Sequence, residues 1–213
     1  DRGQKVQVSP IHELANNLKI KVRHPLSLDS ENEIDHIKKL KPDIAIVVAY
    51  GKILPKSLLN LNKILFINLH ASLLPKWRGA APIQRSIMNL DNETGISVMK
   101  IISKLDAGPV LIQNKIKIDK YTDYQELSEK MSNLGAKLIL EALKLIKNGK
   151  GKFIDQIETD ATYAKKIQKF EAKINWNESA NKIVAKINAL NPNPGCWFEL
   201  NGGRLKVLKA KEI

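Results

Sequence analysis

Two short apolar runs, at residues 44–49 and 65–70, restrict the possible folds of this chain more than any other feature. The first, Ile-Ala-Ile-Val-Val-Ala, is continuous and β-branched, the pattern of a strand buried on both faces in a parallel sheet. A short helix is expected between the runs, at about residues 55–61. A strand, a helix and a strand in this order form a βαβ crossover, so we predict an α/β protein with a Rossmann-like, mostly parallel sheet and flanking helices.

The rest of the chain adds helical and strand-like segments to this unit. Apolar spacing and capping residues predict helices at residues 10–18, 31–40, 80–90, 122–146 and 177–190. Alternation predicts strands at residues 21–24, 95–101, 110–118, 196–200 and 204–210, the last two joined by Asn201-Gly-Gly. The apolar positions of the 122–146 helix, Met131 included, are expected in the core.

Periodicity also suggests how the 213 residues divide into domains. Residues 1–152 are expected to form the main α/β domain, and residues 153–173, whose periodicity is broken, a linker. A basic helix followed by a hairpin at residues 174–213 predicts the beginning of a small, OB-like β-barrel domain. The opening at Asp1 and the strand-like last residues suggest that parts of both ends of the fold are missing.

The formal charge of +13 predicts attraction to a polyanion, since neutralising phosphates with Lys or Arg releases counterions. The simpler alternative is a lysine-rich composition that only solvates the surface. The bases concentrate after residue 161, where candidates for anion contact are Lys182, Lys186, Arg204 and Lys206. With one cysteine, no metal-ligand spacing and no apolar run near the ~20 residues of a membrane span, we expect a cytoplasmic protein without metal or membrane contact.

Two polar residues near the end of the second run are the first candidates for a site. Side chains in a strand alternate between faces, so Asn68 and His70 are expected on one face and Ile67 and Leu69 on the other. A buried polar group without a partner costs about 1–3 kcal/mol. The pair is therefore either a satisfied structural pair or part of a site.

Asp106, in a turn before Gly108-Pro109, is a third candidate. It can simply brace its turn. An amide donor, an imidazole that exchanges protons near neutrality and a carboxylate together suit acyl transfer to an amine without a covalent enzyme intermediate. Ser72, in the loop after His70, is expected to be a turn residue rather than a nucleophile. The G-x-G-x-x-G, phosphate-loop, H-E-x-x-H and G-x-S-x-G motifs are absent from these residues.

Three stretches resemble a known family: residues 49–55 (Ala-Tyr-Gly-Lys-Ile-Leu-Pro), residues 68–84 and residues 105–109 (Leu-Asp-Ala-Gly-Pro). The second reads Asn-Leu-His-Ala-Ser-Leu-Leu-Pro-Lys-Trp-Arg-Gly-Ala-Ala-Pro-Ile-Gln. The set N-x-H, S-L-L-P and D-x-G is similar to that of the 10-formyltetrahydrofolate-dependent formyltransferases. The Trp-Arg-Gly-Ala-Ala-Pro-Ile-Gln stretch and Asn191-Pro-Asn-Pro-Gly-Cys-Trp197 resemble the branch that acts on tRNA.

The resemblance implies an enzyme that moves a formyl group from 10-formyltetrahydrofolate to the α-amine of methionyl initiator tRNA, in translation initiation. It implies that Asn68, His70 and Asp106 are catalytic and that the loop Ser72, Leu73, Leu74 and Pro75 binds tetrahydrofolate. Arg2 resembles the end of a basic loop that contacts tRNA. We expect a monomer.

Two alternatives remain at this point. One is a formyltransferase or hydrolase of the same family that acts on a small amine or on water. The other is a tRNA-binding homologue without catalysis. Salt-sensitive tRNA binding would argue against the first, and tetrahydrofolate binding against the second.

Overall fold

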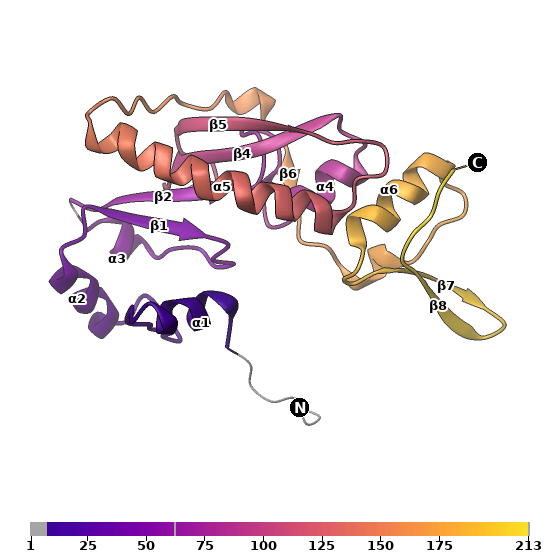
Figure 1. The fold of residues 1–213 in the computed structure, drawn as a ribbon, viewed down its shortest axis with the longest axis horizontal. Helices are drawn as coiled ribbons and strands as arrows, with labels where there is room; N and C mark the ends of the chain where they lie inside the picture. The colour runs from indigo at the N-terminus through magenta and orange to yellow at the C-terminus, as the bar shows by residue number, and fades with distance from the viewer. Residues whose placement is uncertain (1–7, 62, 213) are drawn as a thin grey trace. The chain divides into compact units, whose positions relative to one another are not determined.

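The computed structural model describes residues 8–61 and 63–212, and the chain divides into two compact units between Lys41 and Pro42 (Figure 1). Arg2 lies outside the described residues. The first unit contains helices α1 (Pro10–Asn17) and α2 (Glu31–Leu40), which confirms both predicted helices. Ser9 caps α1, its hydroxyl accepting a hydrogen bond from the backbone N–H of His12 at 3.3 Å.

The strand predicted at residues 21–24 is wrong, because the structure has no strand there. Arg23 instead forms an ion pair with Glu33 of α2. The guanidinium hydrogen bond lowers the pKa of the Glu33 carboxyl. The segment predicted as a strand is thus a loop whose arginine side chain binds to helix α2.

The second unit is built on a four-stranded sheet in the order β1-β2-β4-β5 (Figure 1). Its strands are β1 (Ile44–Val48), β2 (Leu65–His70), β4 (Glu93–Lys100) and β5 (Val110–Lys117), and α3 (Lys56–Leu59) connects the first two. The β1–β2 pair is parallel, whereas β4 joins β2 and β5 joins β4 in the antiparallel direction. The α/β class, with helices flanking the sheet, is confirmed.

Strand β1 is less buried than its sequence predicts. Its only neighbour among the described strands is β2, so it lies at an edge of this sheet. Ile46 is 46% exposed and Val48 is 56% exposed. The prediction of a strand buried on both faces is therefore wrong for the described residues.

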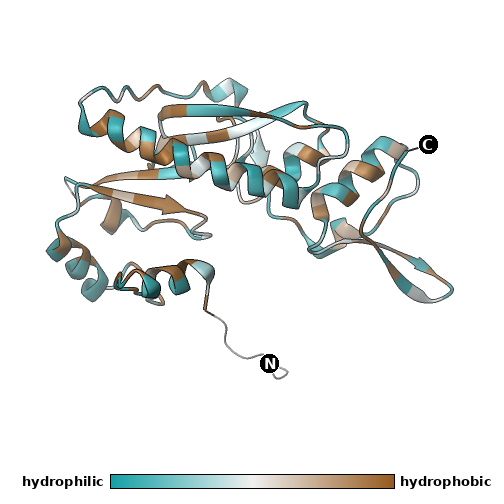
Figure 2. Ribbon diagram, in the orientation of Figure 1, coloured by the Kyte–Doolittle hydropathy of each residue, from teal (hydrophilic) through white to brown (hydrophobic). Residues whose placement is uncertain are grey.

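Helices α4 (Pro82–Met88) and α5 (Tyr124–Lys147) confirm the predicted helices that follow β2 and β5. The residues of α5 alternate between apolar and polar around its axis, as Figure 2 shows by colour. Its buried residues Leu127, Met131, Leu138 and Ala142 pack with Ile67, Ile96 and Val98 of the sheet. This core fixes β2, and with it the position of His70.

The segment predicted as a linker, residues 153–173, forms strand pairs with the main domain. Ile154 pairs with Val110, and the short strand β6 (Tyr163–Ala164) pairs in parallel with β3 (Arg78–Gly79). Two 3₁₀ turns, η1 (Glu158–Asp160) and η2 (Lys169–Ala172), flank β6. Residues far apart in sequence therefore meet beside the loop that follows β2.

The C-terminal residues form helix α6 (Ala180–Leu190) and a hairpin of β7 (Cys196–Leu200) and β8 (Gly203–Val207), as predicted. Asn201 and Gly202 occupy the turn with φ of 50° and 77°, the left-handed conformation of a tight hairpin turn. A second core joins Ile187 and Leu190 to Cys196. Burial raises the pKa of the Cys196 thiol to about 11.

Among the described helices, none combines the length and the apolar composition that a membrane span requires.

Candidate functional site

The end of β2 carries the two predicted polar residues as the alternation required. His70 is 6% exposed, while Ile67 on the opposite face is fully buried. Asn68 is half-buried, and its side-chain amide forms no hydrogen bond with the described residues. An imidazole that is held in place and an amide that is free thus project from the same strand face.

The ring of His70 is bonded at one nitrogen. Its Nε2 lies 2.9 Å from the backbone oxygen of Trp77. A carbonyl oxygen can only accept, so Nε2 carries the hydrogen and donates it. In the neutral ring, Nδ1 is then the nitrogen with the free lone pair.

That free nitrogen faces Asp106. The Nδ1 atom lies 3.8 Å from Oδ2 of Asp106, whose carboxylate also accepts a hydrogen bond from the backbone N–H of Gly79 at 2.8 Å. Gly79 has φ of +117°, and a Cβ there would lie 2.9 Å from the oxygen of Ala164, so this close approach requires glycine. The loop before β5 and the loop after β2 therefore meet at His70.

This geometry suits the histidine to proton transfer. A proton that arrives at Nδ1 produces an imidazolium beside the Asp106 carboxylate, which stabilises it by charge. The free Asn68 amide can donate to an oxygen that gains negative charge nearby. The three groups can therefore take a proton from an amine and stabilise the oxyanion of a tetrahedral intermediate.

The predicted folate loop follows directly, and its side chains are divided between interior and surface. Ser72 is fully buried and donates its hydroxyl hydrogen to the backbone oxygen of Lys76 at 2.6 Å. Leu74 is 5% exposed, whereas Leu73 and Pro75 are half-buried. Ser72 and Leu74 thus shape this loop from inside, and Leu73 and Pro75 are the members that reach its surface.

Two polar residues of the sheet fix the backbone of this loop. Ser97 of β4 donates to the oxygen of Ser72 at 2.6 Å and accepts from the N–H of Leu74 at 3.1 Å. Gln113 of β5 donates to the oxygen of Leu74 at 2.9 Å and to the hydroxyl of Ser97 at 2.8 Å. The loop is therefore preorganised by the sheet beneath it.

The predicted anion-contact residues lie on two elements of the C-terminal part. Lys182 and Lys186 are one turn apart on α6, and Arg204 and Lys206 share a face of β8. Lys182, Arg204 and Lys206 are exposed. Lys186 is only 14% exposed and forms an ion pair with Glu178 at 2.7 Å, so the structure gives it an internal partner.

Aromatic and basic side chains contact one another on and beside the hairpin. The guanidinium carbon of Arg204 lies 3.6 Å from the ring centre of Trp197, and Lys173 Nζ lies 5.3 Å from it. Phe198 packs edge-on against Trp176, with ring centres 5.3 Å apart. Stacked aromatic and basic groups of this kind suit contact with nucleic acid.

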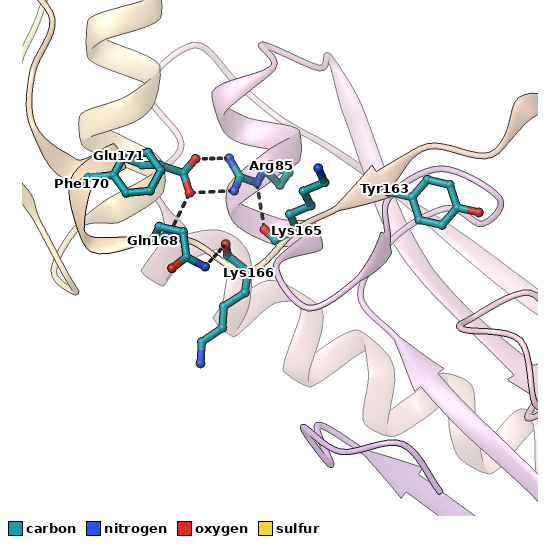
Figure 3. A pocket seen from close by; sticks show the side chains of 7 residues that line it. All are labelled: Arg85, Tyr163, Lys165, Lys166, Gln168, Phe170 and Glu171. Carbon is teal, nitrogen blue, oxygen red and sulfur yellow. Dashed lines mark hydrogen bonds and ion pairs between the residues drawn. The ribbon is translucent and has the colours of Figure 1, made fainter. Parts of the chain in front are cut away.

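A pocket lies between α4 and the segment around η2, where Lys165, Lys166 and Phe170 contribute to its walls (Figure 3). At its centre Arg85 donates two hydrogen bonds to Glu171, at 2.6 and 3.0 Å. These bonds hold the pKa of the Glu171 carboxyl below its usual value of 4.5, despite an opposing effect of burial. The ion pair fastens the segment after β6 to α4.

Replacing Glu171 with glutamine tests that connection through its pH dependence. A carboxylate with a lowered pKa in the folded state stabilises the fold above its unfolded pKa, and this contribution is lost as pH falls through the folded pKa. We expect Glu171→Gln to lower the free energy of unfolding by about 1–2 kcal/mol at pH 7. The difference from wild type should shrink below about pH 4.5.

The measurement is urea unfolding of both proteins at a series of pH values. Glu141→Gln is the matched control, because Glu141 is exposed on α5 and has no ion pair with the described residues. It should stay within about 0.5 kcal/mol of wild type. A Glu171→Gln deficit of equal size at pH 7 and pH 3 would contradict the account.

Three residues that order this site were not found from the sequence. Trp77 contributes its backbone oxygen to His70, and its own N–H donates to the hydroxyl of Thr162 at 2.9 Å. Gln156 bonds to the Asp106 loop. A contact made by a backbone atom cannot be recognised from the residue type. A single Thr or Gln in a segment without periodicity likewise gives no pattern from which its contacts could be predicted.

Comparison with known proteins identifies the family of this chain. Residues 2–143 match the model of a family described as formyl transferase, and residues 166–213 match that of the formyl transferase C-terminal domain. The chain therefore belongs to the formyl transferase family, whose members are enzymes. It is a formyltransferase.

One curated protein and two solved structures illustrate the similarity to individual family members. A methionyl-tRNA formyltransferase of Pelagibacter ubique is 51% identical over 99% of this chain and 68% of its own length. The solved 4-N formyltransferase of Francisella tularensis has a TM-score of 0.77 at 22% identity, covering 95% of this chain and 83% of that one. An N-formyltransferase of Helicobacter canadensis, solved with folinic acid and dTDP-3-aminofucose, has a TM-score of 0.76 at 22% identity, covering 98% and 73%. The solved structures confirm the fold.

No group of three or more His, Cys, Asp or Glu residues in the described ranges is arranged to hold a metal ion.

Proposed function

We propose that this protein transfers a formyl group from 10-formyltetrahydrofolate to the α-amino group of methionine on initiator tRNA, acting as a monomer. The observation that carries the proposal is the placement of His70 between the Trp77 oxygen and the Asp106 carboxylate, beside the free amide of Asn68. The name of the Pelagibacter relative supports the acceptor. The folinic acid bound by the Helicobacter protein supports the donor.

The residues of the site supply the catalytic steps. The amine nitrogen attacks the formyl carbon, and His70 Nδ1 takes the proton that this nitrogen loses. The Asn68 amide donates to the oxyanion, and Asp106 stabilises the imidazolium. The bond between the formyl carbon and N10 of the donor then breaks, and the proton returns from His70 to N10.

The loop of Ser72, Leu73, Leu74 and Pro75 is proposed to bind the folate. Ser97 and Gln113 fix its backbone, so it needs no reordering when a ligand arrives. Ser72 and Leu74 act by shaping the loop, because they are buried. Leu73 and Pro75 are the members of the loop that can contact the ligand.

The tRNA is proposed to contact Arg2, Lys182, Lys186, Arg204 and Lys206. Residues 1–152 would form the catalytic domain, residues 153–173 the linker and residues 174–213 the beginning of the tRNA-binding domain. Exposed bases beside Trp197 support this assignment. Because phosphate contacts release counterions, tRNA affinity should fall steeply with salt.

Comparison of acceptors tests the proposal. The full-length protein is given 10-formyltetrahydrofolate with methionyl initiator tRNA, with a nucleotide-linked amino sugar, or with water alone, and kcat/KM is measured for each. We expect transfer to the charged tRNA to exceed the others by at least about 10³-fold, with a KM that rises with salt. A higher kcat/KM for the amino sugar would contradict the proposal, as would release of formate at the same rate with and without tRNA.

A further inference from the structure

The side chain of Gln156 joins the two loops that form the site. Its Nε2 donates to the backbone oxygens of Asp106 and Gly108, at 2.8 and 2.7 Å. Its Oε1 accepts from Nε and Nη2 of Arg78, at 3.1 and 2.9 Å. An amide side chain has two donor hydrogens and two acceptor lone pairs, so every hydrogen-bonding position of Gln156 is used.

Both loops are otherwise closely confined where Gln156 binds them. A Cβ at Gly108 would lie 1.8 Å from the backbone oxygen of Lys100, so this part of the Asp106 loop lies directly against β4. Arg78 is fully buried, and its neighbour Gly79 donates to the Asp106 carboxylate. Gly79 donates to the Asp106 carboxylate, and Gln156 binds on both sides of this hydrogen bond. It donates to the backbone of Asp106 and accepts from Arg78, the residue before Gly79.

The consequence for the site follows from the distances. The Asp106 carboxylate lies 3.8 Å from Nδ1 of His70, and its direction is set by the hydrogen bond from Gly79. A shift of either loop changes that separation, and a misplacement of 1 Å can cost about 10²-fold in rate. Gln156 forms no hydrogen bond with the described His70 or Asn68, so its effect would pass through Asp106.

We propose that Gln156 is a positioning residue for formyl transfer, which holds the Asp106 carboxylate at its working distance from His70. The inference rests on the proposed function. The segment before η1 would then help to order the site, because it carries the side chain that connects the two loops.

The substitution Gln156→Glu separates the two halves of the contact. A glutamate accepts from Arg78 as before but has no hydrogens for the oxygens of Asp106 and Gly108. We expect kcat to fall by about 10- to 100-fold, with KM for the charged tRNA and for the folate within about twofold of wild type. Gln156→Met, which has similar volume, removes both halves of the contact, so its kcat should fall at least as far. It is the second variant to measure if Gln156→Glu does not fold.

Glu158→Gln is the matched control. Glu158 binds Nη1 of the same Arg78 at 2.9 Å and Nζ of Lys104, but no backbone atom of the Asp106 loop. Its kcat should stay within about twofold of wild type. An equal loss of kcat in Glu158→Gln and Gln156→Glu would overturn the proposal.

Two further readouts separate positioning from general support of the fold. In an Asp106→Asn background, Gln156→Glu should change kcat by less than about twofold, because the group it positions is gone. The ¹⁵N chemical shifts of the His70 ring, measured at fixed pH without substrates, should differ between wild type and Gln156→Glu. A full additional loss of kcat, or ring shifts unchanged from wild type, would overturn the proposal.

The ring shifts need no turnover. Absence of formyl transfer in the wild-type protein would therefore refute the proposed function, while the shifts would still decide whether Gln156 positions the His70–Asp106 pair.

Discussion

Replacing His70 by alanine is expected to lower kcat for formyl transfer by about 10²- to 10⁴-fold, the usual contribution of a general acid–base group. The loss follows from the geometry, since Nδ1 is the nitrogen left free by the hydrogen bond of Nε2 to Trp77. Without the ring, the proton of the attacking amine has no acceptor beside Asp106. The measurement is steady-state transfer to charged tRNA, with KM determined for both substrates.

The variant should remain folded, because the imidazole has a single hydrogen-bond partner in the described structure, the Trp77 oxygen. That oxygen loses its donor, so we expect a fall in unfolding free energy of about 1–3 kcal/mol. His24→Ala is the control, because His24 is exposed in the first unit, and its kcat should match wild type. A folded His70→Ala protein with near-wild-type turnover would rule out His70 as the catalytic base.

Arg78→Ala should give the largest loss of stability among the substitutions considered. The Arg78 side chain is fully buried and donates to Gln156 and Glu158. Its removal leaves a cavity and takes both donors from the Gln156 oxygen. We expect a fall of about 3–5 kcal/mol in the free energy of unfolding.

Urea unfolding at pH 7 measures this loss. Lys104→Ala is the matched control, because Lys104 binds the same Glu158 carboxylate but is 56% exposed. Surface ion pairs contribute little, so this variant should stay within about 1 kcal/mol of wild type. Equal losses for the two substitutions would mean that Glu158, rather than the buried guanidinium, connects these segments.

Much of the fold could be predicted because its signals are local. The β-branched run of β1, the apolar spacing of α5 and the turn at Asn201 and Gly202 each determine a structure within a few residues. Alternation along β2 also placed Asn68 and His70 on one face. These local patterns were sufficient for the class of fold and for two of the three proposed catalytic residues.

The remaining features depend on contacts between segments far apart in the chain. The resemblance implied that Asp106 belongs with His70, but only the structure shows the 3.8 Å between them. Strand β4 pairs with β2 in the antiparallel direction, and strand propensity does not specify the direction in which two strands pair. Gln156 was assigned to a linker because its segment lacks periodicity, although its hydrogen bonds connect the two loops that form the site.

The proposed function requires that the amine of a charged tRNA receives the formyl group at His70. The most direct test is a single-turnover reaction of the full-length protein with 10-formyltetrahydrofolate labelled at the formyl carbon and methionyl initiator tRNA, followed by release and mass analysis of the amino acid. We expect labelled N-formylmethionine in wild type and a rate lower by at least about 10²-fold in His70→Ala. Label that appears only as formate, or equal rates in the two proteins, would contradict it.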